Sequence, residues 1–464
     1  MATQTKGKSL DLSEGPILSR LVAFAAPILL GQLFQTLYNS VDSIVIGNFV
    51  SDDPVVCTNA LAAVTASASI ANFLVGFFVG LSTGASVLFS RSFGGKDYDT
   101  LDQAIHTTLL FSVIFGAIVA VLGAILTPTL LSLVSCPPEV MADAIIYLRI
   151  YMIGALCLAM YNVAAGVLRS IGDSQAPFRY LVLASCMNIV LDIAFVAVLK
   201  MGVAGVAIAT VISQMTSVLL SCRRMMGMDE RYAFRFDKLK INGGLLKQVM
   251  VLGLPAAIQS SITGLSNMYL QRYMNSFSPA VISGIGSGMK IDQFAGMPCN
   301  ALGLAMTTFI GQNMGANKPE RARQGTRMVV LAVTVYVAAV SVPVFLLADK
   351  VVGLFGKDPT MISYGAGFLH TIMPVYLIMG FQMLFGGIIR GYGYSIQTMC
   401  FSVFGMVAMR QLWLAVSMSI ERKVSNIYLG YPIGWACVLI PMLVFYFWKI
   451  RPQISLKNIS ESNT

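Results

Sequence analysis

Long runs of apolar residues, separated by short polar segments, extend along the chain from residue 17 to residue 448. Each run can cross a bilayer as a helix, because about 20 residues span the hydrocarbon core. A backbone in lipid must satisfy its own hydrogen bonds, and a helix does so within one segment. The pattern therefore predicts twelve transmembrane helices, near residues 17–50, 55–90, 104–134, 144–168, 178–199, 203–222, 248–276, 279–310, 327–348, 361–389, 397–420 and 425–448.

The composition agrees with a membrane-embedded chain. Only 11% of the 464 residues are charged and 56% are hydrophobic, whereas about 25% of a typical soluble chain is charged. This balance excludes a soluble enzyme, a disordered chain and a fibrous repeat. The eight cysteines occur singly, without a Cys-x-x-Cys pair, and are expected to pack as small apolar residues. The predicted fold class is an all-α membrane protein.

The basic residues indicate the orientation of the chain. With the N-terminus inside, 22 Lys and Arg residues fall in inner segments and 7 in outer ones. The positive-inside rule then predicts that both termini are cytoplasmic. The net charge of +10 is explained by this placement, so no nucleic-acid partner is expected.

The two halves of the chain repeat each other. Gly94, Pro138, Gly166, Arg169 and Gly172 recur at an offset of 221 as Gly315, Pro359, Gly387, Arg390 and Gly393, and Pro27 and Asn39 recur at 228 as Pro255 and Asn267. Six spans per half make the repeats enter the membrane in the same sense, which is typical of transporters with alternating access. We expect an N-terminal lobe at 1–222, a cytoplasmic linker at 223–247 and a C-terminal lobe at 248–464.

Three acidic residues fall well inside predicted spans: Asp42, Asp192 and Asp292. An acid at membrane depth is costly and therefore a functional candidate. Asp42 and Asp192 each lie eight residues before the outer end of an outward-running helix, or roughly 12 Å below it at 1.5 Å per residue. Thr210 on the next helix comes to nearly the same depth, so the sequence predicts a polar cluster in the first lobe.

Each of these two acids has a polar neighbour four residues earlier on its own helix face: Tyr38 for Asp42 and Asn188 for Asp192. Two carboxylates in a low-dielectric pocket cannot both ionise cheaply, so one is expected to take up a proton near neutral pH. The same oxygens suit Na+, which prefers oxygen ligands. The residues leave H+ coupling, Na+ coupling and a purely structural cross-link open.

Other polar residues inside the spans have less defined roles. Lys290 and Asp292 are two residues apart and do not face one another, so each is expected to find another partner or to reach a cavity. Arg410 and Asn39 are further cavity or coupling candidates, and His370 is either a packing residue or a proton relay.

Several segments together resemble the multidrug and toxic compound extrusion (MATE) transporters, in particular the prokaryotic DinF-like branch. They are Pro27 with Tyr38-Asn39-Ser40-Val41-Asp42, Ser90 to Gly94, Gly166 to Asp173, Asn188 with Asp192, Gly202 to Ala207 with Thr210, and Gly311 to Gly315. The resemblance implies two lobes arranged in a V, export coupled to H+ or Na+, and a cation site at Asp42, Asn188, Asp192 and Thr210 beside Tyr38.

The chain departs from the family's other main branch, because its predicted helices 7 and 10 contain no acid. Coupling is therefore expected in the first lobe, with protonation bending the first helix at Pro27. We expect a prokaryotic plasma-membrane exporter of amphipathic, lipophilic cations that works without a cofactor, in contact with membrane lipids and as a monomer. A lipid-linked oligosaccharide flippase of the same superfamily is the alternative, and no enzymatic constellation is evident.

Overall fold

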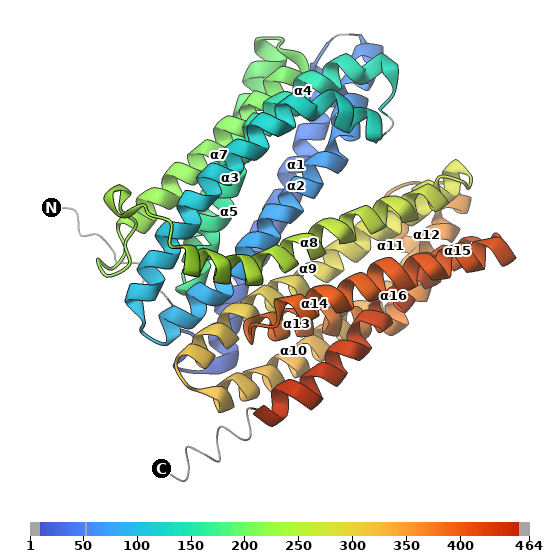
Figure 1. The fold of residues 1–464 in the computed structure, drawn as a ribbon. Coiled ribbons are helices and arrows are strands. Elements are labelled where there is room, and N and C mark those ends of the chain that lie inside the picture. The colour runs from blue at the N-terminus through green and yellow to red at the C-terminus, as the bar shows by residue number, and fades with distance from the viewer. Residues whose placement is uncertain (1–9, 52, 135, 454–464) are drawn as a thin grey trace. The chain divides into compact units, whose positions relative to one another are not determined.

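Helices form the regular structure of residues 10–51, 53–134 and 136–453, which are the residues described by this computed structural model (Figure 1). The α-helices are α1 (Ile17–Phe49), α2 (Pro54–Gly94), α3 (Tyr98–Leu133), α4 (Met141–Ile153), α5 (Ala155–Ser170), α6 (Gln175–Asp192), α7 (Gly202–Met226), α8 (Gly243–Met274), α9 (Pro279–Gly315), α10 (Pro319–Leu346), α11 (Ala348–Val352), α12 (Pro359–Ile372), α13 (Tyr376–Gly391), α14 (Ser395–Ser402), α15 (Arg410–Ile420) and α16 (Val424–Phe445). Three π-helical segments are η2 (Ile193–Val198), η5 (Val403–Met409) and η6 (Tyr446–Ile450), and the 3-10 turns are η1 (Pro138–Val140), η3 (Phe236–Lys238) and η4 (Met373–Val375). Both chain termini, which the charge pattern assigns to the cytoplasm, lie outside the described residues.

The predicted number of membrane spans is confirmed. Among the described residues, eleven helical segments are long and apolar enough to cross a membrane, and a twelfth span combines Pro138–Ile153 with Ala155–Ser170. That span bends by 43° at Gly154, where a Cβ atom would come within 2.7 Å of Val211 Cγ2 on α7. The break was not predicted, because the close approach of α7 at this glycine is a tertiary contact.

The described chain divides into two compact units. Among the described residues, 10–11 and those within 26–257 form unit 1, and 12–25 and 258–453 form unit 2. The boundaries fall inside α1, just before Pro27, and inside α8, just after Pro255. This division by contacts differs from the expected lobes: it assigns residues 12–25 to unit 2 and residues 248–257 to unit 1. The lobes themselves remain a prediction.

Unit 1 is built by the close packing of α2 through α7. On α2, Gly80 and Gly84 lie against the backbone of α8 at Ala256 and Leu252, so any side chain at these glycines would collide with that backbone. Small residues at helix contacts are typical of membrane bundles, where backbones approach closely. Helix α2 itself begins with Pro54 after Asp53, whose carboxylate caps the helix by accepting from the Val55 N–H at 2.8 Å.

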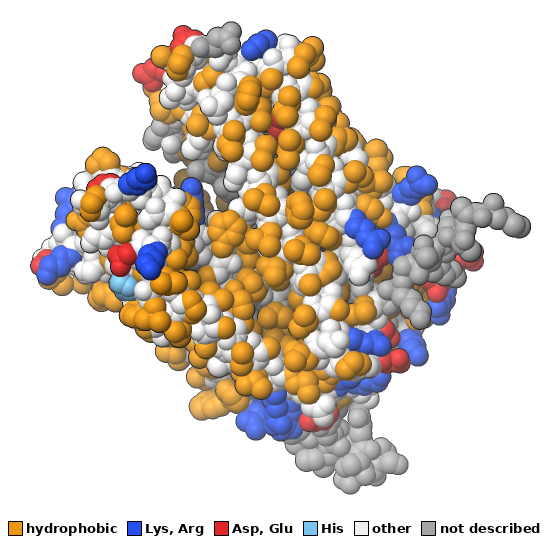
Figure 2. Space-filling model, turned by 180° about the vertical axis from the view of Figure 1, so that it is seen from behind, with side chains coloured by type: hydrophobic (Ala, Val, Ile, Leu, Met, Phe, Trp, Pro, Cys, Tyr) orange, Lys and Arg blue, Asp and Glu red, His pale blue; other side chains and the backbone are white. Residues whose placement is uncertain are grey.

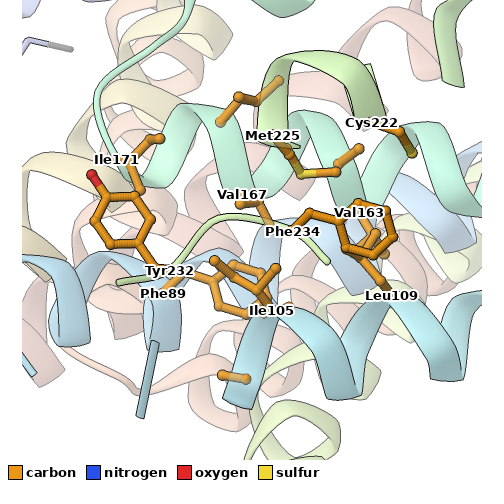
Figure 3. Close-up of a cluster of buried hydrophobic side chains, with 14 of the residues drawn as sticks. Phe89, Ile105, Leu109, Val163, Val167, Ile171, Cys222, Met225, Tyr232 and Phe234 are labelled. Atoms are coloured by element: carbon orange, nitrogen blue, oxygen red, sulfur yellow. The ribbon is translucent and has the colours of Figure 1, made fainter. Parts of the chain in front are cut away.

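The loop between α7 and α8 packs against unit 1 as a structured element. Tyr232 and Phe234 are buried in a hydrophobic cluster with Phe89, Ile105 and Val167 (Figure 3). Burial raises the pKa of Tyr232 to about 12, so its hydroxyl keeps its proton at physiological pH. The aromatic residues of the loop therefore serve as core residues of unit 1.

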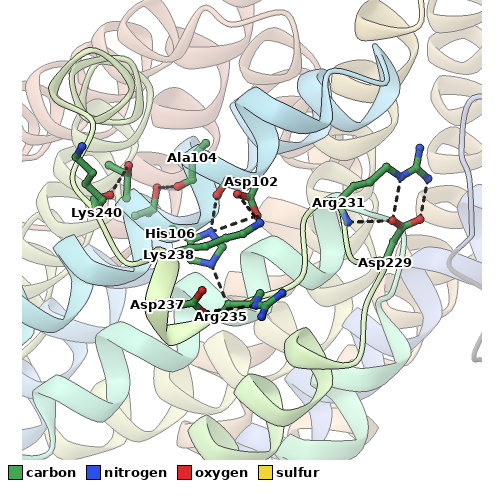
Figure 4. Close-up of polar contacts among 11 residues, drawn as sticks. Asp102, Ala104, His106, Asp229, Arg231, Arg235, Asp237, Lys238 and Lys240 are labelled. Atoms are coloured by element: carbon green, nitrogen blue, oxygen red, sulfur yellow. Dashed lines mark hydrogen bonds and ion pairs between the residues drawn. The ribbon is translucent and has the colours of Figure 1, made fainter.

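Polar contacts fix the same loop to the N-terminal part of α3. The His106 Nδ1 lies 2.7 Å from the Asp102 carbonyl oxygen, and Nε2 accepts from the Arg235 N–H at 3.0 Å (Figure 4). Lys238 Nζ pairs with the Asp102 carboxylate at 3.2 Å. His106 thus accepts with one ring nitrogen and donates with the other, which is the pattern of a neutral imidazole.

Unit 2 repeats the turn geometry of unit 1. Lys96 and Asn317, which are 221 residues apart, have φ of 57° and 55°, and Gly172 and Gly393, at the same offset, have φ of 89° and 93°. Within unit 2, α9 packs against α12 and α13, and α16 packs against α13, α15 and η5. The shared backbone conformations give structural support to the repeats read from the sequence.

The outer surface of the helices is apolar, as the bilayer requires. Hydrophobic side chains cover most of the face drawn in Figure 2. On α3, for example, Val121, Leu122 and Ile125 are exposed. The exposed apolar side chains and the long spans together define a multi-pass membrane protein.

Gly172→Ala is expected to destabilise unit 1. Its φ of +89° disfavours any residue with a Cβ, and that Cβ would meet the Leu10 carbonyl oxygen, so the expected loss is about 1–3 kcal/mol. Thermal unfolding in detergent measures the effect. Gly243→Ala is the matched control, because no atom lies within 4 Å of the added Cβ; an equal loss in both variants would contradict the argument.

Candidate functional site

Helix α1 carries the first two residues of the candidate site. Tyr38 and Asp42 are four residues apart and therefore share one helix face, and both are half-buried. Tyr38 is hydrogen-bonded to Gln35. Asn39, one residue along, is exposed on another face, where its carbonyl oxygen accepts from Ser43 Oγ at 3.0 Å.

Helix α6 carries Asn188 and Asp192 in the interior of unit 1, where they are 2% and 0% exposed. Asp192 is the last residue of α6, and the π-helical segment η2 follows it directly. Such π segments loosen the regular hydrogen-bond ladder and are frequent at functional sites. The sequence predicted a helix through this region but gave no signal for the change in its winding.

The Asp42 and Asp192 carboxyl groups contact each other across α1 and α6. Asp42 Oδ1 and both Asp192 oxygens are buried and have no hydrogen-bond donor among the described residues. Carboxylate oxygens are acceptors only, unless protonated. The contact can therefore become a hydrogen bond only when one carboxyl group holds a proton, or it can be bridged by a cation.

A cavity of about 70 Å³ lies in unit 1 beside this pair. Tyr38, Asn188 and Thr210 line it, whereas the two carboxyl groups are not among its lining residues. The Asn188 amide nitrogen and oxygen are buried without a partner. Thr210 Oγ1 donates to the Val206 carbonyl oxygen at 3.0 Å, which leaves its lone pairs available. The cavity is thus lined by polar atoms of Asn188 that have no hydrogen-bond partner among the described residues, and a polar cavity of this kind can hold water.

The oxygen atoms of this cluster fit the donor set of a small hard cation. Asp42, Asn188, Asp192 and Thr210 offer carboxylate, amide and hydroxyl oxygens, the ligand types that Na+ shares with other hard ions. Among the described residues there is no group of three or more His, Cys, Asp or Glu side chains that could hold a metal ion. The cluster therefore offers oxygen ligands of the kind that a small hard cation accepts.

Sequence analysis missed the aromatic side of this site. Tyr147 and Tyr151 on α4 stack with ring centroids 6.2 Å apart, and Tyr147 lies within electrostatic range of both carboxylates. Tyr151 lines the cavity and is hydrogen-bonded to Gln214. Their spacing of four residues was the available signal, but tyrosines are common at membrane interfaces, so their sequence alone did not indicate an interior position.

The remaining candidates lie in unit 2 and do not join this cluster. Asp292 Oδ1 accepts from the buried Tyr376 hydroxyl at 2.9 Å. Lys290 is exposed, with Nζ 5.7 Å from the Phe355 ring centroid. Lys290 and Asp292 thus have separate partners, and their predicted roles in a cavity or in coupling remain predictions.

The other two candidates of unit 2 also have local partners. His370 is exposed, and its Nε2 lies 3.1 Å from the Phe345 carbonyl oxygen, with the two rings 4.8 Å apart. Arg410 is fully buried and donates to Ser266 and Asn267.

Comparisons with known proteins identify the family. The family profile described as MatE matches residues 27–194 and 255–410. The chain therefore belongs to the MatE family, the multidrug and toxic compound extrusion transporters. Because this family consists of membrane transporters, the chain is a transporter and not an enzyme.

Individual relatives cover nearly the whole chain. The "Probable multidrug resistance protein YpnP" of Bacillus subtilis (strain 168) is 29% identical over 98% of this chain and 100% of its own length. The "FAD transporter" of Shewanella oneidensis is 24% identical over 82% of this chain and 86% of its own length. A solved structure titled "Crystal structure of MATE in the bent conformation" matches with a TM-score of 0.86 at 22% identity, covering 98% of this chain and 99% of that chain. The last match confirms the predicted fold class.

Asp42→Asn is expected to stabilise the protein in Na+-free buffer at alkaline pH. The new amide supplies an N–H for Asp192, and one of two unpaired carboxylates disappears, which is worth about 1–3 kcal/mol. Thermal unfolding in detergent measures the change. Asp292→Asn is the control, because Asp292 already accepts from Tyr376. If both substitutions destabilise the protein equally, Asp42 is an ordinary structural acceptor.

Proposed function

We propose that the protein is a secondary active multidrug exporter that exchanges lipophilic, cationic compounds for H+ or Na+ by alternating access. The proposal rests on the contact between the Asp42 and Asp192 carboxyl groups. Asp42 Oδ1 and both Asp192 oxygens are buried and have no hydrogen-bond donor among the described residues. Such a pair is stable only with a proton or a cation between its oxygens. Binding and release of that ion would change the free energy of unit 1, which is the requirement for coupling transport to an ion gradient.

Helix α1 would transmit the change. Asp42 lies on this helix, and Pro27 interrupts its hydrogen-bond ladder because proline has no N–H for the Ala23 carbonyl. The boundary between the two compact units also falls beside Pro27. We propose that occupancy of the carboxylate pair alters the bend of α1 at Pro27, and that both termini are cytoplasmic in a prokaryotic plasma membrane, as the charge pattern predicts.

The relatives support export but leave the cargo open. The name of the Bacillus subtilis relative refers to multidrug resistance and that of the Shewanella relative to FAD. For this chain, the aromatic and amide lining of the unit 1 cavity, with Tyr38, Tyr151 and Gln214, suits flat organic cations through stacking and cation-π contacts. A lipid-linked oligosaccharide flippase remains the second candidate from the sequence, but no additional observation favours it.

Asp192→Asn is expected to slow dye export by roughly tenfold or more, within the usual range of coupling between two sites. Purified protein in proteoliposomes is given an ethidium load and an imposed H+ gradient, with and without Na+, and dye movement is followed by fluorescence. Dependence on the H+ gradient alone identifies proton coupling, and dependence on Na+ identifies sodium coupling.

Asp53→Asn is the matched control for this experiment. It makes the same chemical change outside the spans, and asparagine caps a helix as well as aspartate does. Wild-type export by the Asp192→Asn variant at equal protein levels would refute the coupling role of the pair. Loss of export in both variants would point to a folding defect, which the thermal unfolding assay would detect.

A further inference from the structure

The most unusual charge in unit 2 is Arg410, the first residue of α15 after the π-helical segment η5. Its side chain is 0% exposed. The Nη2 atom donates to Ser266 Oγ at 2.6 Å and to Asn267 Oδ1 at 2.9 Å. Both acceptors are neutral side chains of α8, so these bonds leave the positive charge of the guanidinium uncompensated.

The rest of the guanidinium has no acceptor among the described residues. Its Nε and Nη1 atoms are buried without a hydrogen-bond partner, and no described acid forms an ion pair with it. Arginine cannot lose its proton in a protein, and an unpaired charge at membrane depth is costly. An acceptor with negative charge is therefore the group that this environment lacks.

A second donor, the Tyr431 hydroxyl on α16, belongs to a ring close to the Arg410 guanidinium. The Arg410 side chain lies along α16, with Cδ and Cγ 3.4 and 3.7 Å from Cβ positions built at Gly434 and Gly430. Between these glycines, the Tyr431 ring centroid lies 6.0 Å from the guanidinium carbon. The Tyr431 hydroxyl is also buried without a partner, so two side chains offer unpaired O–H and N–H donors.

The Arg410 guanidinium is hydrogen-bonded to a side chain at the surface of unit 2. Asn267, which accepts from Arg410, is itself exposed. One turn earlier on α8, no atom lies within 4 Å of a Cβ built at Gly264. Asn267 is therefore the exposed side chain through which Arg410 is linked to the surface of α8.

The repeats differ in charge at this depth. At the offsets of 228 and 221, Asp42 and Asp192 correspond to Leu270 and Trp413, and Arg410 corresponds to Ile189. Unit 1 thus has two acids and no base at these positions, whereas unit 2 has one base and no acid. The two repeats have opposite binding preferences at equivalent places.

We propose that Arg410, with Tyr431 and Asn267, binds an anionic oxygen group, a carboxylate or a phosphate, of a small transported molecule. Guanidinium and phenol donors suit such oxyanions. The cargo range of the protein would then include organic anions and zwitterions beside the cations proposed above. The site is independent of the carboxylate pair in unit 1.

Equilibrium dialysis of the full-length protein in lipid nanodiscs tests this site. The probes are radiolabelled benzoate, phenyl phosphate and benzyltrimethylammonium, which share one ring and differ in charge. We expect saturable binding of at least one anionic probe to the wild-type protein. The affinity for that probe should fall by roughly tenfold or more in Arg410→Gln and in Tyr431→Phe. Arg410→Lys should restore part of the affinity, because it keeps the charge without the planar donor set.

Matched variants separate binding from folding. Tyr336→Phe removes an ordinary hydrogen bond of unit 2, from Tyr336 Oη to the Ala295 carbonyl oxygen at 2.9 Å, and should leave benzoate affinity unchanged. Asp192→Asn should slow dye export but keep benzoate binding, so failure of the proposed exporter function is distinguishable from failure of this site.

Three results would overturn the proposal. The first is that neither anionic probe binds the wild-type protein. The second is equal affinity in wild type and in folded Arg410→Gln. The third is complete displacement of the bound probe by chloride, at concentrations at which sulfate and formate displace none. That result would identify a chloride site and not a site for oxyanions.

Discussion

The contact between two acceptor groups, the Asp42 and Asp192 carboxylates, is the constraint around which the interior of unit 1 is organised. Neither group can satisfy the other without a proton or a cation. The surrounding atoms do not remove this need, because the buried Asn188 amide is itself unpaired and Thr210 already donates to its own helix. The described residues therefore leave these buried oxygens without a donor, and this is the observation on which the proposed ion coupling rests.

Other parts of unit 1 are closely packed. Glycines on α2 allow backbone contact with α8, and the loop after α7 is fixed by buried aromatics and by His106. This packing contrasts with α1 and α6, where Pro27 and the π-helical segment η2 interrupt the regular ladders. The interruptions occur on α1 and directly after α6, the two helices that carry the carboxylates.

Unit 2 shares the turns of unit 1 but not its electrostatics. The positive φ angles at Asn317 and Gly393 match those at Lys96 and Gly172, because the backbone of the repeat is constrained by helix packing. The buried charges are not constrained in this way. Among the described residues, Arg410 in unit 2 has no acidic partner, and Asp42 Oδ1 and both Asp192 oxygens in unit 1 have no donor. The common scaffold thus carries buried groups of opposite charge type in the two units.

The sequence by itself determined the twelve spans and the repeat, because lipid imposes apolar helices, and it predicted a shared depth for Asp42, Asp192 and Thr210 from the fixed rise per residue. It also indicated which acids are costly enough to be functional candidates. Only the tertiary structure decided that the two carboxylates touch, that Tyr147 and Tyr151 join them, and that the span at Gly154 is broken. Rotation of each helix about its axis and close approach of neighbouring backbones set these features, and both depend on packing between segments far apart in the chain.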